Sequence, residues 1–198
     1  MSIVLPTRKR LSPQESRALA LGAARDLLRE EGVQAITLKA VAAKIGKTHA
    51  NLLHHFGSVA GLHRALADEI AHQVAAKITA SIGRMRRGEG RLRDVVEGMF
   101  AAFEQEKVGE LMAWVVMTRQ REALEPVVEA IADVIRDISE PGDTRPLDQA
   151  TLGLVLLAIG DSLAGAEVAR ACGLPRSAAR DIAVQQVIAV LAGKKVVG

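Results

Sequence analysis

Apolar residues recur at helical spacing along almost the whole chain, and short polar or glycine-containing breaks separate the segments. Apolar side chains three or four positions apart share one face of a helix, so each segment predicts an amphipathic helix. No alternation of period two and useful length appears, and strands are therefore not expected. The chain is predicted to be all-α with about nine helices, which cover approximately 13–31, 38–45, 48–55, 58–85, 91–106, 109–121, 124–139, 147–171 and 176–191.

The segment 37–56, TLKAVAAKIGKTHANLLHHF, predicts two short helices around a tight turn. Thr37 is a favourable N-cap for the first helix, and Thr48 is a second N-cap only two residues after Gly46. Gly46 supplies the positive φ that a sharp helix ending needs. The second helix carries side chains that can reach base edges or phosphates: His49, Asn51, His54 and His55. This arrangement is typical of a helix-turn-helix DNA reader.

The chain before this segment predicts a basic arm and a first helix. Residues 1–11 have no helical periodicity and contain Arg8, Lys9 and Arg10, which favours a flexible basic arm. Ser12, Pro13 and Glu15 then form the pattern of a capping box at a helix start. We expect a DNA-binding domain over 12–57 and a second domain over 58–198 that binds a ligand and forms a dimer.

Positive charge is concentrated in the predicted DNA-binding part. Residues 1–57 contain nine Lys or Arg against four Asp or Glu, whereas residues 58–198 contain seventeen against nineteen. A local basic surplus attracts the phosphate backbone of DNA. The charge distribution therefore agrees with the motif.

The sequences AVAAKIGKTHANLLHHFGSVAGL and, upstream, ALALGAARDLLREEG resemble the TetR family of one-component transcriptional regulators. The resemblance implies a three-helix DNA-binding domain followed by a helical domain for ligand binding and dimerisation. It also implies a homodimer that binds double-stranded DNA at a palindromic operator. The family's usual action is repression, with release of the operator when a small molecule binds the C-terminal domain.

Three positions depart from the family pattern. Leu53 stands where the family usually has a Tyr, and Val59 stands where it usually has a Lys, and both family residues contact phosphates. Lys47 replaces an apolar turn residue and adds a positive charge. By resemblance, the predicted DNA-binding residues are Thr37, Lys39, Lys47, Thr48, His49, Asn51, Leu53, His54 and His55, with His49 and Asn51 as base readers and most of the others as phosphate partners.

The segment 147–171 is apolar on more than one side, which predicts a buried helix. By resemblance, the last two helices pair with their copies in a second subunit, and Ala183, Val187, Val190 and Leu191 suit that contact. The longest apolar run, 152–159, is shorter than the roughly 20 residues of a membrane helix, so no membrane span is expected. A single Cys172 and the absence of a signal-peptide pattern favour the cytoplasm.

The middle helices are expected to hold the effector. Met99, Phe103, Trp114 and Met117 are candidate ligand contacts, although such residues also fill ordinary cores. With few aromatic residues in the chain, a flexible and largely apolar effector fits better than a flat cation. Asp161 in an apolar helix either holds a donor group of the ligand or pairs with an arginine such as Arg119 or Arg121, or across the dimer interface.

A metal-binding helical bundle is the alternative, because Glu69 and His72 have the Glu-x-x-His spacing of di-iron bundles. Such a site needs a second copy, and no other His has a Glu three positions before it. The segment 46–48, Gly-Lys-Thr, resembles the end of a P-loop but follows a predicted helix instead of a strand. No nucleophile pattern appears, so neither an enzyme activity nor a metal or cofactor is expected.

Overall fold

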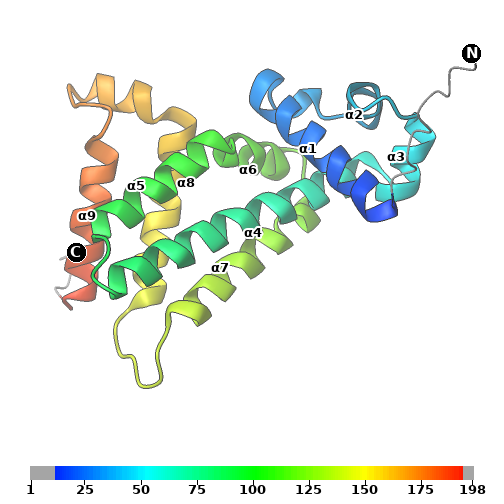
Figure 1. Ribbon diagram of the computed structural model, residues 1–198. Helices are drawn as coiled ribbons and strands as arrows, with labels where there is room; N and C mark the ends of the chain where they lie inside the picture. Colours follow the sequence, from blue (N-terminus) through cyan, green and yellow to red (C-terminus); the bar gives the residue numbers. More distant parts are fainter. Residues whose placement is uncertain (1–11, 194–198) are drawn as a thin grey trace, which may run out of the picture.

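The computed structural model describes residues 12–193, and the basic arm predicted over 1–11 lies outside these residues. The described part is all-helical, as predicted, and contains nine α-helices and two short 3₁₀ turns (Figure 1). The elements are α1 (Pro13–Glu31), η1 (Val33–Ala35), α2 (Leu38–Lys44), α3 (His49–Phe56), α4 (Val59–Arg86), α5 (Leu92–Gln105), α6 (Val108–Met117), η2 (Arg121–Ala123), α7 (Glu125–Ile138), α8 (Leu147–Ala171) and α9 (Ala178–Leu191).

Side-chain caps set the starts of the first four helices. The Ser12 hydroxyl accepts a hydrogen bond from the Glu15 amide at 3.1 Å, and the Glu15 carboxylate accepts one from the Ser12 amide at 2.7 Å. Thr37, Thr48 and Ser58 each accept a hydrogen bond from the amide three residues later. These caps satisfy amides that have no partner inside their own helix, which explains why local sequence predicts these boundaries well.

The sixth helix ends earlier than the sequence pattern predicts. The periodicity indicates a helix to residue 121, whereas α6 ends at Met117. Arg119 has a left-handed backbone (φ 58°), and the Thr118 hydroxyl donates to the carbonyl of Trp114. A left-handed residue ends an α-helix, so the following residues form η2 instead.

Helix α4 connects the two ends of the molecule. Figure 1 shows α1, α2 and α3 gathered at one end, with α8 and α9 toward the other end and α4 running between them. One apolar core runs through both parts, and its fully buried side chains include Leu28, Leu52, Leu62, Leu66 and Phe100. A close approach fixes the junction of α3 and α4, because a Cβ at Gly61 would lie 2.0 Å from the carbonyl oxygen of Phe56.

Helix α8 is not buried in the single chain, contrary to the prediction. Only three of its residues are buried, whereas Leu152, Leu156, Leu163 and Val168 are exposed. Helices α5, α6 and α9 pack against α8 but leave one apolar face uncovered. Periodicity shows that a helix lacks a polar side, but it cannot show whether the covering partner belongs to the same chain.

Helix α8 is also the one described helix that is long and apolar enough to cross a membrane, with a mean hydropathy of 1.7 over 18 residues. Gly160 and Asp161 end the uninterrupted apolar run early, so the length of that run did not predict this property of the whole helix. A packed helix in a water-soluble protein passes the same test of length and composition.

Candidate nucleic-acid interface and internal cavity

Helices α2 and α3 form the predicted helix-turn-helix. Gly46 lies in the turn with φ 64°, and the Lys47 amide donates to the carbonyl of Ala42 at 2.9 Å. Because glycine has no Cβ, it adopts this positive φ without strain, and α3 can begin directly after Thr48. The turn therefore sets the angle between the two helices.

One face of α3 anchors it to the core. Leu52 is fully buried and Phe56 is nearly so, and the guanidinium carbon of Arg17 lies 4.8 Å from the centre of the Phe56 ring. Arg17 also donates to the carbonyl of His55 at the end of α3, at 3.4 Å. This role of Arg17 was not predicted from the sequence. The only signal was a basic residue in the helix that precedes the helix-turn-helix. The opposite face of α3 is exposed.

Most of the predicted DNA-binding residues are accessible on the head, the N-terminal unit formed by α1, α2 and α3. Lys39, Lys47, His49, Leu53 and His54 are exposed. The hydroxyl oxygens of Thr37 and Thr48 serve as helix caps, and each hydroxyl can still donate its own proton to a phosphate. His55 is half-buried, and its ring lies 5.7 Å from that of His54.

The two predicted base readers differ in accessibility. His49 is exposed at the start of α3, where a recognition helix contacts base edges. Asn51 is half-buried, and its amide oxygen has no hydrogen-bond partner among the described residues. His49 is therefore the better placed of the two to reach a base.

Leu53 and Val59 place apolar side chains on the surface of the head, each more than a third exposed. Neither can donate a hydrogen bond to a phosphate, unlike the Tyr and Lys that the family usually has there. Any contact of these two side chains with DNA would be limited to van der Waals packing.

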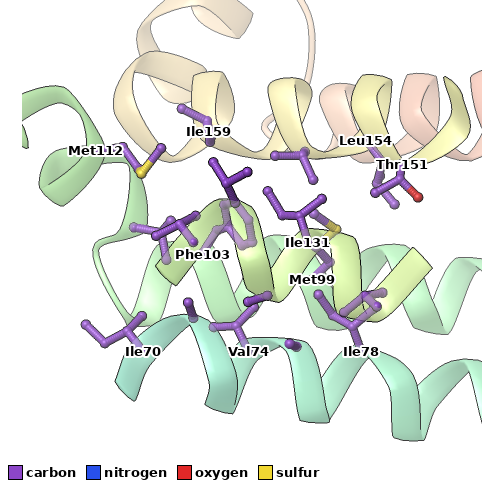
Figure 2. A pocket seen from close by; sticks show the side chains of 18 of the residues that line it. Ile70, Val74, Ile78, Met99, Phe103, Met112, Ile131, Thr151, Leu154 and Ile159 are labelled. Atoms are coloured by element: carbon purple, nitrogen blue, oxygen red, sulfur yellow. The ribbon is translucent and has the colours of Figure 1, made fainter. Parts of the chain in front are cut away.

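Further along the chain, an apolar cavity of about 170 Å³ lies between α4, α5, α6, α7 and α8. Figure 2 shows Ile70, Val74 and Ile78 of α4 along one side and Leu154 and Ile159 of α8 on the opposite side. Thr151 contributes the only polar side chain of the lining among the described residues. A cavity of this kind accepts apolar groups and rejects isolated charges.

Only part of the predicted ligand set reaches this cavity. Met99 and Phe103 line it. Trp114 instead packs edge-on against His63, with the ring centres 4.3 Å apart. Met117 is 82% exposed, because α6 ends there and turns away from the core. The residues that sequence reasoning missed are mainly aliphatic side chains of α4, α7 and α8, which no local signal separates from ordinary core.

Asp161 also lies outside the cavity. Its buried carboxylate pairs with Arg176 and with Arg180, the latter at 3.3 Å. The expectation of an arginine partner is therefore correct, but Arg119 and Arg121 are the wrong arginines. A ligand contact by Asp161 in this cavity is not supported, because two cations already satisfy the carboxylate.

The Glu69 and His72 pair does not form a metal site in the described part of the chain. There, no group of three or more His, Cys, Asp or Glu side chains could hold a metal ion. Glu69 lies 3.6 Å from an Arg25 nitrogen, and His72 Nδ1 lies 3.2 Å from the carboxylate of Asp68. Both side chains have protein partners instead of a shared ion.

His63 lies where the head meets the rest of the molecule. Its Nε2 is 2.9 Å from the carbonyl of Ile36 in the head, and its ring contacts Trp114 of α6. Burial lowers the pKa of His63 below its usual 6.5, although the hydrogen bond to Ile36 acts in the opposite direction. The folded protein therefore favours neutral His63.

Acidification is expected to destabilise the protein partly through this residue. The unfolded chain takes up a proton on His63 near pH 6.5, whereas the folded chain resists it, so stability falls as the pH drops below about 6.5. Between pH 7.5 and 5.5, His63→Gln should lose less unfolding free energy than the parent chain, by up to about 1.4 kcal/mol. Urea titrations followed by circular dichroism measure this difference. His72→Gln, at an exposed position, is the control, and equal losses in all three proteins would contradict the prediction.

The geometry of α1, α2 and α3 defines the class of helix-turn-helix DNA-binding regulators. Residues 20–66 match the family model described as "Bacterial regulatory proteins, tetR family". This match over α1–α3 and the start of α4 confirms the resemblance drawn from the motif.

The comparison with curated proteins finds no match in sequence. Among solved structures, the chain is similar to a crystal structure described as a tetR family transcription regulator from Shewanella sp. PV-4. The identity is 16%, the match covers 86% of this chain and 95% of that chain, and the TM-score is 0.49.

Proposed function

We propose that the protein is a homodimeric transcriptional repressor that binds a palindromic operator and releases it when a largely apolar small molecule occupies the cavity. The arrangement of helix α3 supports DNA binding. Leu52 and Phe56 anchor its apolar face in the core, whereas His49, Leu53 and His54 are exposed. An arm over 1–11, a reader over 12–57 and an effector domain over 58–198 belong to the same proposal. So does a cytoplasmic location, and no catalytic step is proposed.

A dimer is proposed because one short recognition helix reads few base pairs. Helix α3 has eight residues, so useful specificity requires a second copy at a half-site about 34 Å away. The exposed apolar side chains of α8 and α9 offer the surface for pairing: Leu152, Leu156, Leu163, Ile182 and Ile188. Two copies related by a two-fold axis would cover this surface and align the two heads with a palindrome.

Release requires a connection between the cavity and the head. Glu106 follows α5 and lies between Phe103 and Val108, which both line the cavity. The Glu106 side chain is only 3% exposed, and its carboxylate pairs with Arg29 at 2.7 Å and with Arg25 at 3.3 Å. Both arginines belong to α1, so this carboxylate ties the head to the corner between α5 and α6.

We infer that filling the cavity displaces this corner and changes the orientation of α1. The effector need only prefer the arrangement in which the two recognition helices no longer match the half-site spacing. Its effect on DNA affinity then equals its difference in affinity for the two arrangements. Helix α6, which contacts η1 and α8, would move with the corner.

Selection of the purified protein on a random double-stranded DNA pool tests the proposal. Enrichment of a two-fold palindrome, followed by saturable binding in an anisotropy titration at fixed salt, is the expected result. Salt must be fixed because phosphate contacts dominate affinity. Failure to enrich any sequence would overturn the proposed operator binding.

Lys47 is expected to contribute a phosphate contact. Its exposed ammonium lies in the turn before α3, so Lys47→Ala should weaken operator binding severalfold and reduce the slope of log affinity against log salt by about one. Lys44→Ala is a matched control, because Lys44 donates to Glu30 at 2.7 Å and that carboxylate raises the pKa of Lys44. Unchanged affinity and slope in Lys47→Ala would argue against this contact.

A further inference from the structure

A second hollow adjoins the apolar cavity. A groove of about 330 Å³ runs between α4 and α5, and it shares three wall residues with the cavity: Ile78, Val95 and Met99. In Figure 2, Ile78 and Met99 lie toward the end of the cavity that is farther from Met112. These three side chains therefore form a shared partition between the apolar cavity and the groove.

The groove carries positive charge and no negative charge in its lining. Lys77, Ser81 and Arg84 line it from α4, at positions that share one helix face, and no Asp or Glu contributes. Arg84 donates to the Ser81 hydroxyl at 2.8 Å and forms no ion pair with the described carboxylates. The nearest carboxylate oxygen to the Lys77 ammonium belongs to Glu106, at 4.0 Å. Arg84 is thus free to engage an external anion, and Lys77 is held only by this long ion pair.

The partition between the two spaces can open. Met99 is unbranched and has several rotatable bonds, so it can change rotamer at little cost. Ile78 is half-buried and lies at the edge of the groove. A chain that passes between them would have its end in the cavity and its head beside Lys77 and Arg84.

The cavity sets the length of that chain. A cavity of about 150 Å³ holds a benzene molecule, so about 170 Å³ accepts roughly six to eight carbon atoms. One or two further carbons would cross the partition. A charged head cannot stay inside, because burial of an unpaired charge is costly.

We propose that the effector is an anionic amphiphile: an aliphatic chain of about eight to ten carbons that ends in one anionic group. The chain fills the cavity and the anion binds Lys77 and Arg84 in the groove. This assignment rests on the proposed function of the cavity as the effector site, and it names the ligand chemistry of that site.

The anion would also reach the connection to the head. Lys77 lies between the groove and Glu106, the carboxylate that holds Arg25 and Arg29 of α1. An anion in the groove competes with Glu106 for Lys77. Binding of the head group therefore changes the charges around the contact that positions α1.

Calorimetric titration of the full chain with three ligands of equal chain length tests the charge requirement. The ligands are decanoate, 1-decanol and decyltrimethylammonium, each below its aggregation concentration and at low salt. Decanoate is expected to bind at least tenfold more tightly than decanol, and the cation more weakly than decanol. Equal or tighter binding of decanol or of the cation would overturn the proposal.

Two substitutions locate the anion. Arg84→Gln and Lys77→Gln should each lower decanoate affinity severalfold and leave decanol affinity unchanged. Arg136→Gln is the matched control, because this exposed arginine of α7 lines neither the cavity nor the groove. Unchanged decanoate affinity in both groove variants, or an equal loss in Arg136→Gln, would show that the anion binds elsewhere.

Operator release distinguishes an error in the ligand chemistry from an error in the role of the cavity. If decanol matches decanoate in affinity and releases the operator, the cavity remains the effector site and only the anionic head group is wrong. A different result would reject both the effector site and the anionic ligand. In that result no ligand binds the protein, none releases it from the operator, and the cavity-filling variant Met99→Trp still binds the operator normally. Release by decanoate that depends on Arg84 supports both.

Discussion

Leu156→Glu is expected to convert the protein to monomers and to lower operator affinity by more than about a hundredfold. Leu156 is 60% exposed on α8, one turn after the exposed Leu152, and both lie on the apolar face that α9 leaves uncovered. A carboxylate there would be buried without a partner in a dimer. A monomer reads one half-site and loses the gain from linked binding, which typically amounts to 10²–10⁴.

Light scattering after size exclusion measures the mass of the variant, and anisotropy on the selected palindrome measures its affinity. Val116→Glu is the matched control, since Val116 is also 60% exposed but belongs to α6 and not to α8 or α9. The control should remain a dimer and fold normally. If Leu156→Glu also remains a dimer, or if both variants dissociate, the pairing surface is not the exposed face of α8.

The helix-turn-helix was predictable from the sequence because short-range interactions define it. Thr37, Gly46 and Thr48 act on backbone groups within a few residues, and the structure shows these interactions as expected. The all-helical class was equally predictable, because helical periodicity depends only on neighbouring turns.

The cavity and its surroundings depend on contacts that sequence spacing does not determine. Asp161 pairs with arginines fifteen and nineteen positions later, where α9 returns against α8. Met117 had the composition of a core residue, but the left-handed Arg119 ends α6 and leaves Met117 exposed. Tertiary packing decided both outcomes.

The exposed face of α8 shows a related limit. Its apolar composition is evident in the sequence, yet whether this chain or another one covers it is a property of the assembly. The role of Glu106 was not predicted, because the sequence does not show which glutamate of this segment is buried. In the segment FEQEKV, Glu104 and Glu106 look alike, although only Glu106 is buried.

Glu106→Gln is expected to lower the free energy of unfolding by about 2 kcal/mol and to loosen the head. The substitution leaves the guanidinium groups of Arg25 and Arg29 without their shared carboxylate, and loss of one partner of a buried pair costs up to 3–5 kcal/mol. We expect the smaller value because Arg29 is partly exposed and can regain water. Urea unfolding followed by circular dichroism measures the change.

Glu104→Gln, two residues earlier and within α5, is the control. Glu104 is exposed and pairs with Arg180 at 3.1 Å, and exposed pairs contribute less than about 1 kcal/mol. Hydrogen exchange separates a local effect from a global one. Glu106→Gln should raise amide exchange in α1 more than in α8, because only α1 loses its attachment to the corner between α5 and α6.

The same variant tests how the cavity and the head communicate. If Glu106 transmits occupancy of the cavity to α1, Glu106→Gln should still bind the effector but should release the operator less completely, because the two arrangements of the head then differ less in effector affinity. Glu106 lines neither hollow, so the variant keeps the lining that binds the effector, and loss of its competition for Lys77 should leave the affinity for an anionic effector equal or higher. Full release by Glu106→Gln, together with amide exchange in α1 equal to that of Glu104→Gln, would show that Glu106 does not connect the cavity to the head. The contact between α6 and η1 would then be the next element to test.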